Sequence, residues 1–176
     1  MLIKQGELVI RDATENDADQ LCIWWNDGKV MEHAGFPQGL MTSTERIIKL
    51  IKTDTIENKR LILERNSKLI GEMSYRKVSE GVVEIGIKIC EFSEHGKGYG
   101  TCYLKMLIDY LFDTLNYSKI ILDTNIKNLR AQHLYEKIGF KKVGINNNAW
   151  KDQLGNPQTS IDYELSVQQY KKNYNV

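Results

Sequence analysis

The residues with the clearest chemical potential lie in a short glycine-rich segment, His95–Gly100, which reads HGKGYG. Its glycines let the backbone turn sharply and leave backbone N–H groups uncovered by side chains. A helix is predicted to begin directly after the segment, so these N–H groups would lie at the positive end of the helix dipole. Free amides at a helix N-terminus favour a bound phosphate. We therefore interpret the segment as a phosphate-binding loop.

A glycine-rich turn by itself also suits an ordinary connection between a strand and a helix. The order of these glycines is GxGxG, whereas the dinucleotide-binding fingerprint of Rossmann domains requires GxGxxG. This difference, together with a run of consecutive strands of antiparallel character, argues against a Rossmann-type domain.

The elements that must position this loop are a strand before it and a helix after it. In Val82–Cys90 apolar and polar residues alternate with a period of two, which is typical of a half-buried strand. After the loop, leucine and isoleucine recur at helical spacing as far as Leu115, which predicts a helix with one apolar face. The predicted unit is therefore a strand, the loop and a helix.

The remaining segments alternate between predicted strands and helices. The other expected strands are Leu8–Arg11, Arg60–Glu64, Leu69–Arg76, Lys119–Asp123, Phe140–Gly144 and Ile161–Leu165. Helices are expected after Thr14, after a capping box at Thr42-x-x-Glu45 and over Asn128–Ile138, and a polar loop over Asn146–Gly155. This order predicts an α/β chain with a mixed sheet and helices on both faces, in a single domain over residues 1–176.

Composition restricts the functional class. The formal net charge is +1, which argues against a general nucleic-acid or membrane-surface binder, because both need a strong basic field. The sequence has no apolar run of bilayer-spanning length and no signal-peptide pattern at its start, so a cytoplasmic location is expected. The three cysteines lack zinc-type spacing and are expected to be buried thiols, and no metal site is expected.

A second motif, NLRAQHLYEKIGF, spans Asn128–Phe140. It resembles the N-x-x-A-x-x-L-Y-x-x-x-G-F segment of the GNAT acetyltransferases. The segment HGKGYG resembles their Q/R-x-x-G-x-G/A loop, which binds the diphosphate of acetyl-CoA. His95 departs from this pattern, because Gln or Arg is usual at its position. The resemblance covers nearly the whole chain, and it is strongest to the branch that holds ribosomal-protein N-terminal, spermidine and aminoglycoside acetyltransferases.

This resemblance implies the GNAT acyl-CoA N-acyltransferase fold, a mostly antiparallel sheet with helices on both faces. In that family the fourth and fifth strands separate, and the pantetheine arm of the cofactor fills the gap like an extra strand. Here these strands would be Val82–Cys90 and Lys119–Asp123. The backbone of Ile87, Ile89 and Cys90 would then bind the pantetheine amides and polarise the thioester carbonyl.

The resemblance also implies which residues contact acetyl-CoA. Lys97 and Thr101 are placed to meet the diphosphate, and Lys97 is favoured because its charge helps there. Asn128 suits the N-cap of its helix and is implied as a cofactor contact as well. The full set of expected cofactor contacts is Ile87, Ile89, Cys90, His95, Gly96, Lys97, Gly98, Tyr99, Gly100, Thr101 and Asn128.

Tyr135 has two interpretations. Its spacing beside Ala131, Leu134 and Ile138 suits an aromatic residue of the core. The resemblance instead implies that its hydroxyl faces the cofactor sulfur and protonates the departing thiolate, and we favour this catalytic role. Full proton transfer would need a lowered tyrosine pKa; otherwise the hydroxyl would donate while charge builds on sulfur.

A base is also required, because an alkylamine with a pKa near ~10 is almost wholly protonated at neutral pH. Glu84 is the first candidate for this base. An exposed strand glutamate, paired with a neighbouring lysine, is an equal interpretation of the same residue. Glu72, on the preceding strand, is the reserve candidate and an expected substrate contact.

The acceptor pocket is expected to form from the most individual parts of the chain. These are the helix around Trp24–Trp25, the His33–Leu40 loop and the Asn146–Gly155 loop. The other expected substrate contacts are Trp25, His33 and Phe36.

Together these features predict acetyl transfer from acetyl-CoA to a primary amine, by direct attack within a ternary complex. The acceptor is open among a small-molecule amine, a polyamine or aminoglycoside, and a protein N-terminus. The alternative is a non-catalytic acyl-CoA-binding regulatory module, which does not need Tyr135, Asn128 and a strand carboxylate together. The expected partners are acetyl-CoA and the amine, without nucleic acid or membrane, and a homodimer is left open.

Overall fold

The chain folds around one sheet of eight strands, in the order β1-β2-β3-β4-β5-β6-β8-β7. In the computed structural model, which describes residues 1–174, every neighbouring pair is antiparallel except β5 and β6, which are parallel. The strands are β1 (Leu2–Gln5), β2 (Leu8–Asp12), β3 (Asn58–Arg65), β4 (Lys68–Ser79), β5 (Val82–Ile89), β6 (Lys119–Asn125), β7 (Lys141–Lys151) and β8 (Pro157–Ser166).

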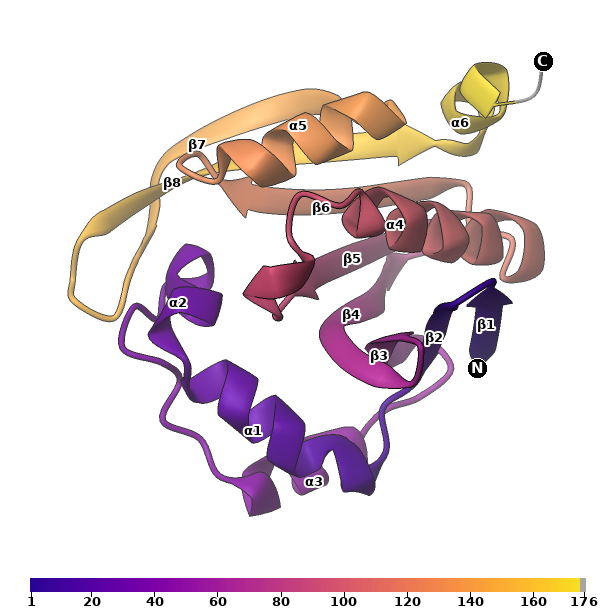
Figure 1. Cartoon of the computed structure of the whole chain (residues 1–176). Coiled ribbons are helices and arrows are strands. Elements are labelled where there is room, and N and C mark those ends of the chain that lie inside the picture. The colour runs from indigo at the N-terminus through magenta and orange to yellow at the C-terminus, as the bar shows by residue number, and fades with distance from the viewer. Residues whose placement is uncertain (175–176) are drawn as a thin grey trace.

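Helices cover both faces of this sheet, as the sequence predicts (Figure 1). They are α1 (Ala18–Asn26), α2 (Gly28–Met31), α3 (Thr44–Ile51), α4 (Tyr99–Asp109), α5 (Leu129–Ile138) and α6 (Val167–Tyr174). Short 3-10 turns lie at Glu15–Asp17, Glu32–Ala34 and Phe92–Glu94, and α4 runs into a π-helical turn at Tyr110–Thr114. Within the described residues, no helix is both long and apolar enough to cross a bilayer.

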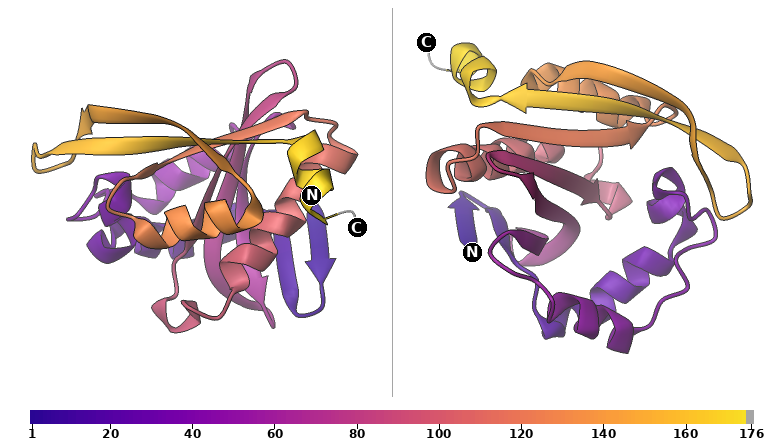
Figure 2. Two further views of the ribbon diagram at one scale, coloured as in Figure 1. Left: turned by 90° about the horizontal axis from the view of Figure 1, so that it is seen from above. Right: turned by 180° about the vertical axis from the view of Figure 1, so that it is seen from behind.

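The core has two parts, one on each face of the sheet. Figure 2 shows the helices that cover these two faces. The larger part packs α4 and α5 against the sheet, and Val83 and Ile85 of β5 belong to it. The smaller part packs α1 and α3 against β3, around Ile62 and Trp24. Because successive strand residues point to opposite faces, Glu84 and Lys88 of β5 lie on the face that carries α1. The predicted period of two in β5 is confirmed.

β5 and β6 separate soon after they begin. Their parallel register joins only Val82 to Lys119, Val83 to Ile120 and Glu84 to Ile121. Beyond Glu84, β5 continues to Ile89 alongside β4, with no β6 residue among its described partners. The separation expected between these two strands is confirmed, and it opens the middle of the sheet.

The predicted order of elements is confirmed with local corrections. The structure adds β1, α2 and α6, none of which was predicted. The N-cap of α3 is Ser43, whose hydroxyl accepts from the Arg46 N–H, so the capping box expected at Thr42 is wrong by one residue. Among the cysteines, Cys90 is buried, Cys22 is half-buried and Cys102 is exposed, which corrects the expectation of buried thiols throughout.

The largest difference concerns the polar segment Asn146–Gly155, predicted as a loop. Its first part continues β7 as far as Lys151, with an irregular register between Asn146 and Trp150. The β7–β8 hairpin thus extends beyond the sheet toward α2 (Figure 1). At its tip the Gln153 N–H donates to the Gly35 carbonyl oxygen at 2.8 Å, and the Gln153 side chain donates to the Gly39 carbonyl.

Candidate active site

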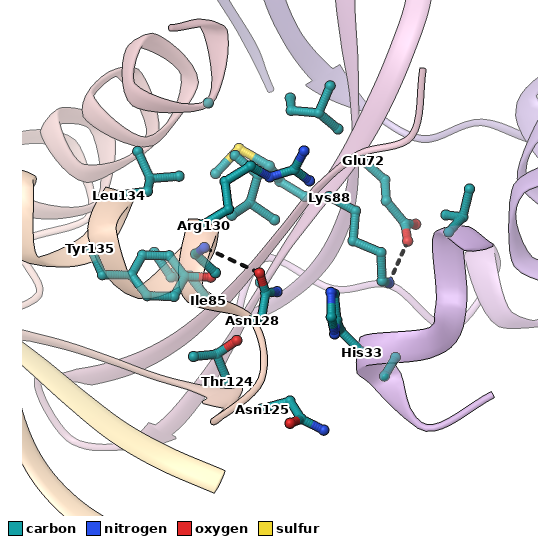
Figure 3. Close-up of a pocket in the computed structure, with 18 of the residues that line it drawn as sticks. His33, Glu72, Ile85, Lys88, Thr124, Asn125, Asn128, Arg130, Leu134 and Tyr135 are labelled. Carbon is teal, nitrogen blue, oxygen red and sulfur yellow. Dashed lines mark hydrogen bonds and ion pairs between the residues drawn. The ribbon is translucent and has the colours of Figure 1, made fainter. Parts of the chain in front are cut away.

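A cavity of about 1150 Å³ lies where β5 and β6 separate. One end is formed by the glycine-rich loop and the first turn of α4, and the other by α2 and the β7–β8 hairpin. Trp25, His33 and Trp150 contribute to the second end, so the three segments expected to form the acceptor pocket are brought together. Figure 3 shows side chains from both ends.

The glycine-rich loop, residues 95–101, has the backbone geometry of an anion site. Gly96 and Gly98 have φ of +74° and +83°, in the left-handed region that side chains disfavour. Gly98 is the N-cap of α4, and a Cβ placed on it would meet no atom within 4 Å. The first N–H groups of α4 have no partner within the helix, so they and the helix dipole favour an anion in this open space.

His95 is held by two hydrogen bonds that use both ring nitrogens. The guanidinium of Arg130, which can only donate, lies 2.5 Å from Nδ1, so this nitrogen accepts. The neutral ring then carries its proton on Nε2, which donates to the Ile89 carbonyl oxygen at 2.7 Å. His95 therefore orients Arg130, a cation at the cavity that sequence reasoning missed.

Two predicted cofactor contacts are placed differently. The Lys97 ammonium pairs with Glu94 at 3.2 Å. Lys97 is not among the described residues that line the cavity, whereas its neighbours in the loop are. Cys90 is buried behind β5, and its N–H already donates to the Ile70 carbonyl at 2.9 Å. Neither residue meets the cavity as expected. Ile87 and Ile89 do line it, but the Ile89 carbonyl is taken by His95.

Asn128 and Tyr135 come from α5. The Asn128 side chain accepts from the Ala131 N–H at 3.2 Å, which confirms it as the N-cap, and it lines the cavity as well (Figure 3). Tyr135 is 5% exposed and packs against the rings of Phe140 and Tyr163. It also lines the cavity, so it belongs to the core and to the site at once.

The environment of Tyr135 keeps its hydroxyl protonated. Burial raises the pKa of Tyr135, and the nearby charge of Asp123 raises it further. A buried phenolate beside a carboxylate is unfavourable for two reasons, because its charge loses its hydration and is repelled by the negative carboxylate. Both effects favour the version of the prediction in which the neutral hydroxyl donates a hydrogen bond while charge builds on sulfur.

Two carboxylates lie on the cavity wall near the point where the strands separate. Glu84 accepts from Nε and Nη2 of Arg76, its register partner on β4. Asp123 of β6 was not predicted as a site residue. Burial raises the pKa of Asp123, and the charges of Glu84 and Asp162 add to the rise. A carboxyl group whose pKa moves toward neutrality suits a general base.

A second carboxylate centre lies toward α1. Glu72 is 9% exposed, and both of its carboxylate oxygens accept from the indole N–H of Trp25 at 3.0 Å. The Lys88 ammonium pairs with the same carboxylate at 2.8 Å. Glu72, Trp25 and His33 line the cavity as expected, whereas Phe36 is outside its described lining.

The family follows from this fold and site. The profile of the acetyltransferase (GNAT) domain matches residues 7–141. This chain belongs to the GNAT acetyltransferase family. Its relatives include the spermidine N(1)-acetyltransferase of Vibrio cholerae, 30% identical over 143 residues, which are 81% of this chain and 78% of the relative. A kanamycin resistance protein of Rhizobium radiobacter is 36% identical over 84 residues, 48% of this chain and 73% of the relative.

Solved structures show the same fold. The spermidine N-acetyltransferase from Vibrio cholerae in complex with CoA and spermine has a TM-score of 0.84 and 22% identity, and the match covers 94% of this chain and 99% of that one. RimL, a ribosomal alpha-N-protein acetyltransferase in complex with CoA, has a TM-score of 0.84 and 16% identity, with 96% and 99% covered. At these identities the likeness extends to the fold and no further.

Proposed function

We propose that the chain transfers the acetyl group of acetyl-CoA to a primary amine, by direct attack in a ternary complex. The observation that carries this proposal is one cavity that joins a glycine-rich loop at a helix N-terminus, an unpaired strand edge, the Tyr135 hydroxyl and the carboxylates of Glu84 and Asp123. A module that only binds acyl-CoA would need the loop and the strand edge alone.

The residues at the loop end fit the CoA part of acetyl-CoA. The open space at Gly96 and Gly98 would take the diphosphate, with N–H groups of α4 as donors and Arg130 as a cation. The edge of β5 that β6 leaves free offers backbone groups around Ile87 to the pantetheine arm. Solved relatives whose names include CoA support this assignment.

The reaction needs two proton movements at opposite ends of the reacting centre. A protonated amine must first lose a proton, and Glu84 or Asp123 is placed on the cavity wall to accept it. The amine nitrogen then attacks the thioester carbonyl carbon, the carbon–sulfur bond breaks, and the sulfur takes a proton. Tyr135 donates a hydrogen bond to the sulfur as negative charge develops there. The nitrogen loses a second proton as the amide forms, and the sulfur gains one. The products are therefore an amide, a thiol and the one proton that the base releases.

The acceptor is a primary amine. The relative named spermidine N(1)-acetyltransferase supports an amine acceptor.

The test is acetyl transfer by the purified chain. Acetyl-CoA is mixed with simple monoamines, diamines, spermidine, kanamycin and short peptides in turn, and thiol release is followed while mass spectrometry identifies the acetylated product. We expect thiol release that depends on the amine, with an equal amount of amide formed. CoA binding without transfer to any of these acceptors would contradict the proposal and favour a regulatory acyl-CoA-binding module.

A further inference from the structure

The acceptor end of the cavity contains a partly buried ion pair whose role the proposed reaction leaves unassigned. Glu72 and Lys88 are register partners on β4 and β5, and the Lys88 ammonium lies 2.8 Å from the Glu72 carboxylate. The Trp25 indole N–H holds the same carboxylate at 3.0 Å. Figure 3 shows this pair beside His33, facing into the cavity.

Lys88 carries a positive charge in this position. Burial opposes its charged form, but the charge of Glu72 and the hydrogen bond to it prevail, so the pKa of Lys88 is raised. The Glu72 carboxylate is consequently neutralised from within the chain. A ligand ammonium that reached for Glu72 would meet the Lys88 ammonium first, and like charges at contact distance repel.

The next pair along the same two strands repeats the arrangement. Arg76 and Glu84 are register partners, and the guanidinium donates twice to the carboxylate. Both glutamates that β4 and β5 present to the cavity thus have a cation from the neighbouring strand. Among the described residues of the cavity wall, two carboxylates have no lysine or arginine partner: Asp123, and the exposed Glu32, whose carboxylate lies 3.6 Å from the His33 ring. Asp123 is the inner one of the two. It lies near Tyr135, at the reacting end.

We propose that Lys88 determines the acceptor class by occupying Glu72, so that the site selects amines with a single positive charge over polyamines and aminoglycosides. This inference rests on the proposed function. Asp123, near Tyr135, suits the reacting amine. A second ammonium further along the acceptor finds Glu72 occupied and is left with the exposed Glu32, where an ion pair contributes little. The selected acceptor has a neutral or anionic remainder. Its class therefore differs from those that the names of the spermidine and kanamycin relatives indicate.

The test compares two acceptors of equal length, n-hexylamine and hexamethylenediamine, which differ by one terminal ammonium. We expect the wild-type chain to favour the monoamine by about tenfold or more in kcat/KM, or ~1.4 kcal/mol. In Lys88→Met the freed Glu72 can pair with the second ammonium, and the preference falls by a similar factor. Lys88→Arg keeps a cation and is expected to retain the preference.

A double variant separates charge release from simple repacking. Lys88→Met combined with Glu72→Gln removes the freed carboxylate, so the gain for the diamine is expected to disappear. Equal kcat/KM for both acceptors in the wild-type chain would overturn the inference. So would a Lys88→Met variant that changes both acceptors by the same factor, because that result indicates a structural role.

A binding measurement keeps the inference independent of turnover. Calorimetric titration of hexamethylenediamine into the chain with CoA present is expected to show tighter binding to Lys88→Met than to the wild type. If none of the amines and peptides is acetylated, the proposed function fails, while this titration still decides the role of Lys88. Unchanged diamine affinity in a variant with native circular dichroism would overturn it.

Discussion

Tyr135 lies at the boundary between the core and the cavity, and its burial determines how it can act. With ordinary values, a tyrosine near ~10 and a thiol near ~8.5, full proton transfer to a thiolate is uphill by about 2 kcal/mol. Burial and the charge of Asp123 raise the pKa of Tyr135 and increase that cost. We therefore expect the hydroxyl to act as a neutral donor whose hydrogen bond strengthens as charge develops on sulfur, which would stabilise the transition state.

Removing this hydroxyl tests the role directly. Tyr135→Phe is expected to fold, to bind acetyl-CoA about as tightly as the parent, and to lose ~10²–10⁴-fold in kcat. The matched control is Tyr163→Phe. The Tyr163 hydroxyl donates to Glu136 at 3.1 Å, and Tyr163 is outside the described cavity lining. This control variant is expected to keep kcat and to lose about 1 kcal/mol of stability. A kcat for Tyr135→Phe within about threefold of the parent would make Tyr135 a residue of the core alone.

Glu84 is tested through the pH dependence of the rate. Glu84→Gln is expected to lower kcat/KM at neutral pH and to recover part of it at alkaline pH, where the amine loses its proton unaided. Glu164→Gln is the control, because Glu164 forms a comparable cross-strand pair with Lys119 outside the described cavity lining. If the profile of Glu84→Gln keeps its shape, the base lies elsewhere. Asp123→Asn is then the next variant, because the raised pKa of Asp123 suits a base, and Glu72→Gln follows.

The glycine-rich loop forms the proposed cofactor end of the cavity. Gly98→Ala places a methyl group in the open space at the N-terminus of α4, at a φ of +83°. We expect CoA affinity to fall about tenfold or more, ~1.4 kcal/mol, as measured by calorimetric titration. Gly6→Ala is the control, because Gly6 also has a positive φ, +59°, and open surroundings, in the turn between β1 and β2. The CoA affinity of Gly6→Ala is expected to equal that of the parent. If Gly98→Ala binds CoA as tightly as Gly6→Ala does, the phosphate role of the loop is refuted.

Local patterns predicted the elements whose signals lie in neighbouring residues. The period of two in β5, the glycines of the loop and the helical spacing in α4 are local, and each matches the structure. The segment Asn146–Gly155 was mispredicted because its polar composition resembles a loop. Pairing with β8 makes its first part a strand, and the contacts of Gln153 with the chain around Gly35 and Gly39 fix the tip. Tertiary context overrides local propensity there.

The sheet brings together residues that are far apart in the sequence and that no local sequence pattern connects. Lys88 and Glu72 meet through the register of β4 and β5, and Arg130 reaches His95 from the next motif. Sequence motifs predicted Tyr135, Asn128 and the loop glycines as site residues, and all of them lie at the cavity. Arg130, Asp123 and the charge of the acceptor end could not be predicted, because they depend on register and on the separation of β5 from β6.

The same geometry favours direct transfer over an acetylated enzyme. Cys90 is the buried cysteine nearest the reacting strands, and burial together with the charge of Glu72 raises the pKa of its thiol. A buried, protonated thiol is a poor nucleophile. This argues against Cys90 as an acetyl carrier and agrees with the proposed direct attack of the amine on acetyl-CoA.

Acetyl transfer to an amine within a ternary complex is tested by initial-rate kinetics in which the concentrations of both substrates are varied. We expect double-reciprocal lines that intersect, and thiol release that begins only when the amine is added, with an unmodified protein mass in acetyl-CoA alone. Parallel lines, together with an acetylated protein formed before the amine is added, would contradict direct attack in a ternary complex.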